Sequence, residues 1–362
     1  MRLLYIVILL ISTTINVGFS YAQTMNKLGI LTGAKNSTYF EFGQDINNII
    51  TSACGAEVKV FETIGSLDNL KKLRKQPFVQ LALVQHDVLS FIKVFKQDDK
   101  ELQDWSEKYR YVFSLYPEEV HILTRKDSGI DRIEQLSGKR VAIGLVNSGT
   151  HLTATMLLNL VGVTIRPIEL APEAGIEKLI SATADKSELD AVFYVVGKPT
   201  PLLASDNRKY SNLKLVSVNN NEALTLYQNA TIGPDDYGWM TGPVRTVSVN
   251  SALISFDFKE EQCSNVAMVA RQIMDNLEEL KRIGHKKWNE VNLQAPVAGW
   301  PRYDCVTEKL ALPIKSSSDS TKRKCEFGGS ATAPVPECNC DRFTGAEKII
   351  CRLSQNRGVC PK

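Results

Sequence analysis

A strand-like run, a glycine turn and a helical run follow one another in Lys139-Arg140-Val141-Ala142-Ile143-Gly144-Leu145-Val146-Asn147-Ser148-Gly149-Thr150-His151-Leu152-Thr153-Ala154-Thr155-Met156-Leu157-Leu158. The apolar residues before Gly144 are typical of a short strand, and helical apolar spacing continues through Leu160. The first N–H groups of such a helix lack backbone acceptors and lie at the positive end of its dipole. We therefore interpret the turn as a seat for a carboxylate or similar anion, formed by Asn147, Ser148, Gly149 and Thr150.

Two other interpretations of this turn have to be weighed. Gly144 and Gly149 are spaced almost as in a phosphate-binding loop, but Thr150 stands where that motif requires lysine, so nucleotide hydrolysis is not expected. An ordinary strand–helix turn with Ser148 or Thr150 as N-cap fits the segment about equally well. The segment alone does not distinguish a binding site from a plain helix cap.

The composition is that of a globular protein. The chain has 362 residues, enough for two domains of ordinary size. It carries 43 lysines and arginines against 40 acidic residues, a net charge of +3. Because this balance is nearly neutral, it argues against a nucleic-acid-binding surface. We expect no nucleic-acid partner, and we expect a monomer.

Residues 1–22 predict a signal peptide. Arg2 precedes the apolar run 3–11, and small residues stand before position 23, where a signal peptidase would cleave. The run is short for a membrane-spanning helix, which needs ~20 apolar residues, and an uncleaved anchor remains the alternative. We expect cleavage near Ala22 and a mature protein that is exported to the periplasm.

Eight cysteines fit an exported chain, because an even count in that setting predicts disulfides. Cys338 and Cys340 raise the alternative of a metal site, but paired CxxC spacings and a nearby histidine are both missing. Cys263 and Cys305 bracket a long helix expected over 262–283, and we predict that they pair with each other; the alternative is that each pairs with the tail. Five cysteines fall after residue 320: Cys325, Cys338, Cys340, Cys351 and Cys360.

Strands followed by polar turns and helical runs predict a parallel α/β architecture. We expect strands over 27–33, 58–62 and 80–85, and helices over 42–50 and 67–73. In such folds ligands collect beyond the carboxyl ends of the strands.

Later segments predict a second α/β unit. Extended segments over 111–115 and 119–124 flank Pro117, and a buried strand is expected over 189–196. The paired carboxylates Glu118-Glu119 lie between the two extended segments, and we interpret them as a solvated turn.

Five motifs occur in order between residues 28 and 310: Gly29-Ile30-Leu31-Thr32-Gly33 with Thr38-Tyr39, Thr63-Ile64-Gly65-Ser66-Leu67-Asp68-Asn69-Leu70, Leu81-Ala82-Leu83-Val84-Gln85, Leu136-Ser137-Gly138-Lys139-Arg140-Val141-Ala142-Ile143-Gly144 with Ser148-Gly149-Thr150, and Asp190-Ala191-Val192-Phe193-Tyr194-Val195-Val196-Gly197. In these motifs the chain resembles solute-binding proteins of the TAXI family, the extracytoplasmic receptors of tripartite ATP-independent periplasmic (TRAP) transporters. The tail from residue 316 has no recognisable counterpart in that family.

The resemblance implies an α/β, two-lobe periplasmic-binding-protein fold, type II-like, that closes around its ligand. Two crossing hinge strands are implied near 113–123 and 247–254. The implied division of the chain is 1–22 signal peptide, 23–115 and 250–315 first lobe, 116–249 second lobe, and 316–362 linker and cysteine-rich tail.

The resemblance also implies a ligand-binding site. The first lobe would supply Gly33, Thr38, Tyr39, Gly65, Ser66 and Gln85, and the second Asn147, Ser148, Gly149, Thr150, Phe193, Val196 and Gly197. Members of the family bind small carboxylates such as glutamate, so an amino acid or a dicarboxylate is the expected ligand and a TRAP-type permease the expected partner. Lys35 lies in the first loop, where the family often has glycines; it would favour an acidic ligand if it faced the cleft, and otherwise it is solvated.

Neither catalysis nor a metal centre is expected. His86, His121, His151 and His285 are scattered without a pair at helical spacing. Ser148 does not lie in a G-x-S-x-G elbow. We therefore expect a binding protein without a cofactor. The alternatives are an exported sensor or partner-docking protein without a permease and, less favoured, an enzyme on the same scaffold.

Overall fold

The computed structural model describes residues 28–181 and 188–311. The predicted signal peptide and the cysteine-rich tail lie outside these residues. Within them, ten strands form one sheet in the order β2-β1-β3-β10-β4-β7-β5-β6, with β8 paired to β4 and β9 to β10. The strands are β1 (Leu28–Leu31), β2 (Val58–Phe61), β3 (Val79–Gln85), β4 (Tyr109–Arg125), β5 (Arg140–Ala142), β6 (Arg166–Ile168), β7 (Ala191–Val196), β8 (Leu213–Leu215), β9 (Gln228–Ile232) and β10 (Val244–Phe256).

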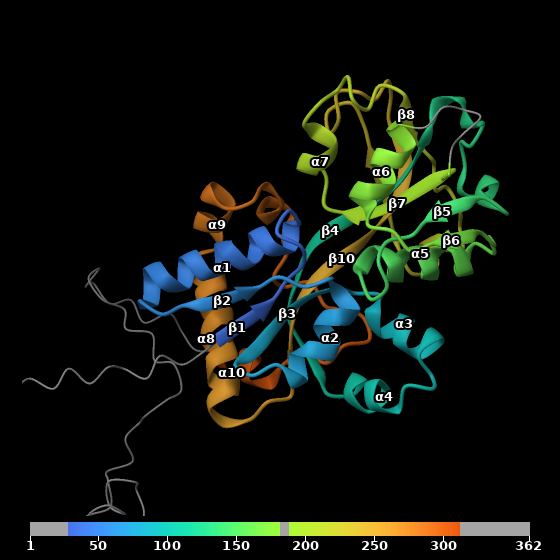
Figure 1. Cartoon of the computed structure of the whole chain (residues 1–362). Helices are drawn as coiled ribbons and strands as arrows, with labels where there is room; N and C mark the ends of the chain where they lie inside the picture. The colour runs from blue at the N-terminus through green and yellow to red at the C-terminus, as the bar shows by residue number, and fades with distance from the viewer. Residues whose placement is uncertain (1–27, 182–187, 312–362) are drawn as a thin grey trace, which may run out of the picture.

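Helices cover the sheet in two separate groups, one at each end (Figure 1). They are α1 (Thr38–Cys54), α2 (Ser66–Lys75), α3 (Val88–Phe95), α4 (Lys100–Ser106), α5 (Gly149–Leu160), α6 (Pro172–Ser181), α7 (Pro201–Ala204), α8 (Glu260–Asp275), α9 (Leu277–Ile283) and α10 (Asp304–Ala311). One lobe is built on the parallel strands β2, β1 and β3, and the other on the parallel strands β7, β5 and β6. The predicted two-lobe α/β fold is confirmed.

Two long strands connect the lobes. β4 has 17 residues and β10 has 13, and they pair antiparallel with each other over most of their length. At one end β10 pairs with β3, and at the other end β4 pairs with β7 (Figure 1). The two extended segments expected around Pro117 are therefore one strand, and their separation was wrong. The ladder is irregular between Asn250 and Ala252, beside the pair Asn250–Pro117, so the missing N–H of proline is tolerated there.

Local sequence explains where the helices begin and end. The Ser37 side chain accepts a hydrogen bond from the Phe40 N–H at the start of α1, and Gly55, with a φ of 63°, ends this helix. The single helix expected over 262–283 is divided into α8 and α9. The division lies at Asn276, whose Nδ2 donates to the Gln272 carbonyl oxygen over 2.8 Å.

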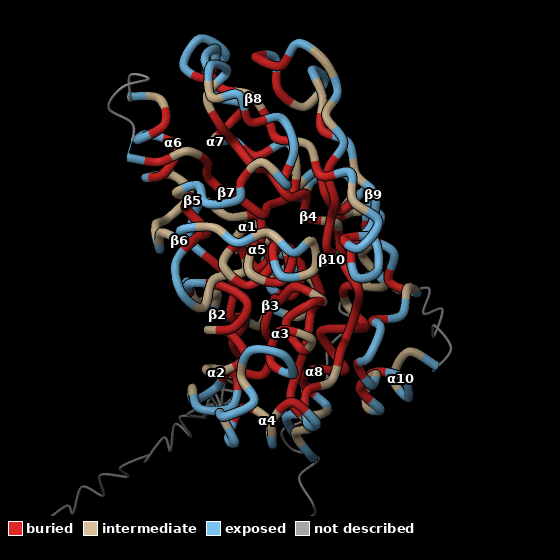
Figure 2. The backbone as a smooth tube through the Cα atoms, turned by 90° about the vertical axis from the view of Figure 1, so that its right-hand side faces the viewer, coloured by how far each residue is buried: buried red, intermediate tan, exposed pale blue. Residues whose placement is uncertain are grey.

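The buried residues follow the strands through both lobes, while the exposed backbone lies around them (Figure 2). The side chains of α1 and α8 pack with β1 and β3 in one apolar cluster that includes Phe42, Leu83 and Val269. The predicted disulfide Cys263–Cys305 is confirmed, with the Cα atoms 5.8 Å apart, and it joins α8 to α10. No helix within the described ranges combines the length and the hydrophobicity needed to cross a membrane.

Candidate functional site

The N-termini of α2 and α5 meet between the lobes. A Cβ added at Gly65, just before α2, would lie 3.2 Å from the backbone nitrogen of Gly149, the first residue of α5. The carbonyl oxygen of Asn147 accepts hydrogen bonds from the backbone N–H groups of Leu67 and Asp68 over 3.2 and 3.3 Å. Because both helix dipoles direct their positive ends here, the place favours an electron-rich oxygen, and in this structure that oxygen belongs to Asn147.

Asn147 is held in an unusual conformation. Its φ of 70° lies in the left-handed region, which asparagine tolerates better than most residues. The ammonium of Lys71, on α2, lies 3.4 Å from Asn147 Oδ1. Asn147 in the second lobe therefore contacts α2 of the first lobe through both its backbone carbonyl and its side chain.

The hydroxyl groups of this turn also hold the fold together. Ser148 Oγ accepts from the His151 N–H over 3.1 Å and caps α5, as the plain-cap interpretation expects. Thr150 Oγ1 accepts from the Val195 N–H over 3.1 Å. Each hydroxyl still has its own proton to donate. The N–H groups of Gly149 and Thr150 have no hydrogen-bond partner in the described ranges, so they are available to a ligand.

A buried chain of polar side chains lies beside the two helix ends. Tyr39 donates from its hydroxyl to Glu118 Oε2 over 3.0 Å. Ser66 Oγ accepts from the Gln85 N–H over 3.0 Å, and Thr153 Oγ1 lies 3.2 Å from Gln85 Oε1. These five residues come from α1, β4, α2, β3 and α5. The structure thus brings the predicted residues Tyr39, Ser66, Gln85 and Gly149 to one place, where a Cβ at Gly149 would lie 2.5 Å from Gln85 Oε1.

Asp87 extends this chain toward the second lobe. The hydroxyls of Thr153 and Tyr227 donate to its Oδ2, each over 2.8 Å. Burial raises the pKa of Asp87 to about 6, and the two hydroxyls oppose the rise. Its Oδ1 is buried without a hydrogen-bond partner among the described residues. Sequence reasoning missed Asp87 and Tyr227; the position of Asp87, two residues past the end of β3, was the available signal.

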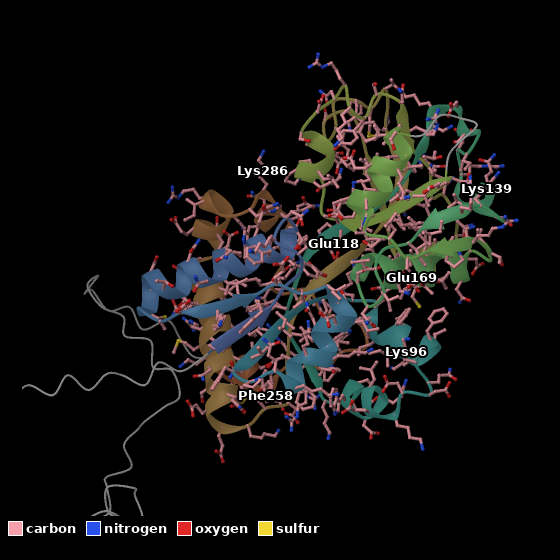
Figure 3. All side chains as sticks on the ribbon, in the orientation of Figure 1. Lys96, Glu118, Lys139, Glu169, Phe258 and Lys286 are labelled. Carbon is pink, nitrogen blue, oxygen red and sulfur yellow. A yellow bond between two sulfur atoms is a disulfide. The ribbon has the colours of Figure 1, made fainter. Side chains whose placement is uncertain are left out.

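The carboxylates of Glu118 and Glu119 are buried, so the expected solvated turn was wrong. Their residues are 5% and 3% exposed, because β4 continues through this position. Glu118 lies at the junction of the two lobes (Figure 3). Burial raises its pKa to about 8, against hydrogen bonds from Tyr39 and Gln85. At neutral pH this carboxyl is therefore mainly protonated.

Glu119 links both lobes through its two oxygens. Its Oε1 lies 2.9 Å from Lys287 Nζ, and its Oε2 accepts from the backbone N–H of Lys198 over 2.8 Å. Lys287 and Glu119 have side chains only 1% and 4% exposed. Burial raises the pKa of Glu119, and the Lys287 ammonium opposes the rise. The ion pair connects β4 to the segment after α9, and the hydrogen bond from Lys198 connects β4 to the region after β7.

We expect Glu118→Gln to remove a pH dependence of stability. The pKa of Glu118 is about 8 in the folded protein and about 4.5 as a free group, so between these values the folded state holds a proton that the unfolded state has lost. Stability then falls as the pH rises, by up to about 2–3 kcal/mol from pH 6 to 8. Urea unfolding at several pH values measures this slope. Glu107→Gln changes an exposed glutamate and is the control, which should keep the wild-type slope. The same slope in Glu118→Gln would contradict the raised pKa of Glu118.

The other predicted residues lie around this cluster. Gly33 follows β1 and accepts from the Thr63 N–H through its carbonyl over 3.2 Å, and Thr38 is buried at the start of α1. Phe193 and Val196 are buried in the apolar cores on the two faces of β7. Gly197 lies against the side chains of Lys287 and Tyr116. Lys35 is exposed, as its solvated alternative expects.

The histidines have structural surroundings. His121 is fully buried, with its ring nitrogens 2.8 Å from the Glu119 carbonyl oxygen and 2.8 Å from the Tyr237 hydroxyl. Burial lowers the pKa of His86 and of His121 to about 4. Across residues 28–181 and 188–311, groups of three or more histidine, cysteine or acidic side chains placed to hold a metal do not occur.

Three solved structures are similar to this chain over much of their length, at low sequence identity. MatC from Rhodopseudomonas palustris with bound malate is 12% identical, with a TM-score of 0.48, over 78% of this chain and 96% of MatC. PhnD1 from Prochlorococcus marinus in complex with methylphosphonate is 13% identical, with a TM-score of 0.48, over 78% of this chain and 96% of PhnD1. The periplasmic binding protein BugD is 10% identical, with a TM-score of 0.49, over 78% of this chain and 93% of BugD.

The sequence profile of the NMT1-like family matches residues 30–301. This range contains both connecting strands and every residue of the buried polar cluster described above. Since it covers well over half of the sequence, the chain belongs to the NMT1-like family.

Proposed function

We propose that this chain is an exported solute-binding protein that closes its two lobes around a small carboxylate. The observation that carries the proposal is the meeting of α2 and α5 at Gly65 and Gly149. Two helix N-termini and the free N–H groups of Gly149 and Thr150 offer converging donors to one anion. The Asn147 carbonyl oxygen, which accepts from α2, marks where a ligand oxygen would bind.

Binding in this place requires the lobes to move. The residues at Gly65 and Gly149 are already in contact, so a ligand can enter only when the lobes separate. A ligand that contacts both lobes then stabilises the closed form by its differential affinity. We assign the hinge to β4 and β10, with the first lobe at residues 23–115 and 250–315 and the second at 116–249.

The buried acids are compatible with an anionic ligand. A protonated Glu118 does not repel a carboxylate and can donate a hydrogen bond to it. Tyr39, Ser66 and Gln85 carry hydroxyl and amide groups, which can hydrogen-bond to a carboxylate. We infer an amino acid such as glutamate, or a dicarboxylate, as the ligand class.

The proposed role is transport. After cleavage of the signal peptide near Ala22, the protein would act in the periplasm as a monomer, in the manner of TAXI-type receptors, and deliver its ligand to a TRAP-type permease. The buried acids and hydroxyls of the cluster hydrogen-bond to one another, and on that ground we propose binding rather than catalysis. An exported sensor that uses the same cleft without a permease is the second candidate, favoured by the additional tail after residue 316.

A thermal-shift screen of the ligand-stripped mature protein against amino acids and mono- and dicarboxylates tests the proposal. A compound at a hundred times its dissociation constant stabilises the folded protein by about 2.7 kcal/mol, which raises the melting temperature measurably. We expect at least one carboxylate to do so. A shift only with uncharged or cationic compounds, or with none of the panel, would contradict the proposed ligand class.

Asn147→Asp gives a site-specific test of the anion seat. This isosteric change puts a fixed negative charge beside the N-termini of α2 and α5, where it would repel an anionic ligand. We expect affinity for the carboxylate found in the screen to fall by at least tenfold, measured by isothermal titration calorimetry. Asn159→Asp, an exposed residue in the last turn of α5, is the control and should bind as the wild type does. Equal affinity in both variants would place the site elsewhere.

A further inference from the structure

The disulfide bonding of Cys54 identifies a contact of the C-terminal tail. Cys54 ends α1 and is disulfide-bonded. Cys263 and Cys305 are bonded to each other, so neither is its partner. The remaining cysteines of the sequence are Cys325, Cys338, Cys340, Cys351 and Cys360. We propose that one of these five is bonded to Cys54, and that residues 349–353 of the tail lie in the groove between α1 and α9.

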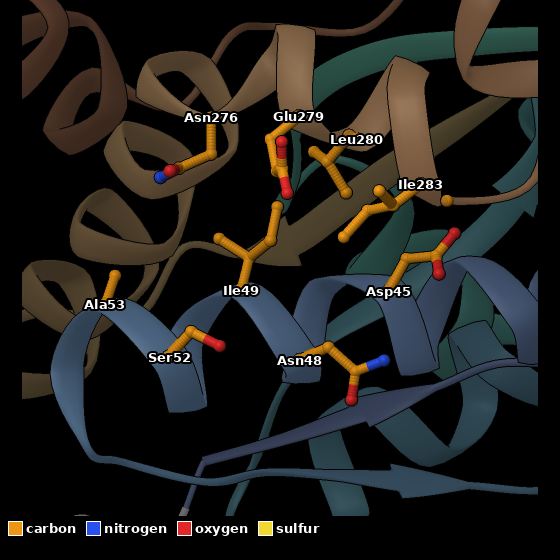
Figure 4. A pocket seen from close by; sticks show the side chains of 10 residues that line it. Asp45, Asn48, Ile49, Ser52, Ala53, Asn276, Glu279, Leu280 and Ile283 are labelled. Carbon is orange, nitrogen blue, oxygen red and sulfur yellow. The ribbon is translucent and has the colours of Figure 1, made fainter.

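A groove begins directly beside Cys54. Its volume is about 350 Å³, and the two helices α1 and α9 form its walls (Figure 4). Ser52 and Ala53, the residues just before Cys54, line one end. Ile49 and Ile283 supply apolar walls, and Ile283 is 61% exposed, more than any other large apolar residue described. A segment bonded to Cys54 therefore starts at the end of an open, partly apolar groove.

The last described helix packs against the same part of the fold as Cys54. α10 ends at Ala311, and Leu310 packs against the same apolar cluster as Cys54. The disulfide Cys263–Cys305 holds α10 to α8, which also packs on α1. Cys325 follows Ala311 by 14 residues, and an extended chain of that length spans about 45 Å. The other four tail cysteines have still longer connections to Ala311.

The tail also carries a suitable apolar run. Ile349 and Ile350 directly precede Cys351, and Leu353 follows it. These side chains match the apolar walls formed by Ile49 and Ile283. We assign residues 349–353 to the groove, because docking them there removes both the exposed Ile283 and the apolar run from water.

Formation of this bond is a two-electron oxidation. The two thiols lose two protons and two electrons as the S–S bond forms, and a disulfide oxidoreductase of the exported compartment is reduced to its dithiol. Because residues 54 and 325–360 enclose most of the chain between them, the bond closes a very long loop. In the chain-entropy view such a bond stabilises the folded protein by restricting the unfolded state.

Peptide mapping of the mature full-length protein without reduction tests the bond. After thiols are blocked and the protein is digested, mass spectrometry should find the Cys54 peptide linked to a peptide from residues 312–362. Reduction should release both peptides. A blocked, free Cys54 thiol, or a Cys54–Cys54 link between two chains, would overturn the proposal.

Hydrogen–deuterium exchange of the full-length protein tests the docking. We expect Ile283→Lys to increase the exchange rate of the tail peptide around 349–353 by at least tenfold, because a charge then faces the apolar run. Val94→Lys is the matched control, since Val94 is an exposed valine on α3, away from the groove, and it should leave this rate unchanged. An unchanged rate in Ile283→Lys, or an equal increase in both variants, would overturn the docking.

Discussion

Gly149→Val will hold the two lobes apart and weaken ligand binding by about 10- to 100-fold. A Cβ at this position would lie 2.5 Å from Oε1, 2.8 Å from Cδ and 3.0 Å from Nε2 of Gln85. The Gln85 side chain is buried between Thr153 and Glu118 and hydrogen-bonds with both, so it has little freedom to move away. Overpacking of this kind costs about 1–3 kcal/mol, and this cost falls on the closed form alone. Each 1.4 kcal/mol is a tenfold loss of affinity.

Two measurements separate closure from binding. Small-angle X-ray scattering should show a larger radius of gyration for Gly149→Val than for the wild type, and calorimetry should show the weaker binding. Gly242→Val is the matched control, because a Cβ at Gly242 has nothing within 4 Å. If Gly149→Val kept the wild-type radius and affinity, the contact between α2 and α5 would not be part of closure.

Lys287→Met will lower the free energy of unfolding by about 3–5 kcal/mol. The change leaves the carboxylate of Glu119 buried and without its counter-ion, which is the costly way to break a buried ion pair. The Lys198 N–H remains as a hydrogen-bond donor to Glu119, but one neutral donor does not replace the ammonium. Denaturant unfolding measures the loss.

Two further variants give this prediction its controls. Lys281→Met breaks an ion pair whose partner, Glu278, is 86% exposed, and we expect a loss below about 1 kcal/mol. Combining Lys287→Met with Glu119→Gln removes both charges and should recover much of the loss. A loss in Lys287→Met no greater than in Lys281→Met would show that the buried pair contributes little.

The sequence predicts the strands and helices of each lobe because their patterns are local. The run that becomes β3 is apolar from Leu81 to Val84, and the turn before α5 contains its own cap in Ser148. Two predicted elements had the wrong bounds, because the residues around one position decide whether the strand or the helix continues there. Pro117 suggests a break, but an irregular ladder beside Asn250 tolerates it, and Asn276 interrupts a helix whose apolar spacing continues through Leu280.

The candidate site could be predicted only where the family resemblance names its residues. Tyr39, Ser66 and Gln85 were implied by that resemblance, and they lie in one cluster. Glu118 and Asp87 were missed, because their burial depends on partners that are far away in the sequence. Tyr227, for example, is 140 residues from Asp87, and periodicity says nothing about such a pair.

The strand order sets the sequence in which the chain can fold. β10 follows every other described strand in the sequence, yet it lies between β3 and β4, in the middle of the sheet. Until β10 has been synthesised, β3 presents an unpaired edge, while β5, β6 and β7 can already pair with one another and with β4. The second lobe can thus form during synthesis, whereas the first has to wait for its central strand. Such late, long-range pairing slows folding and leaves the edge of β3 unpaired for longer.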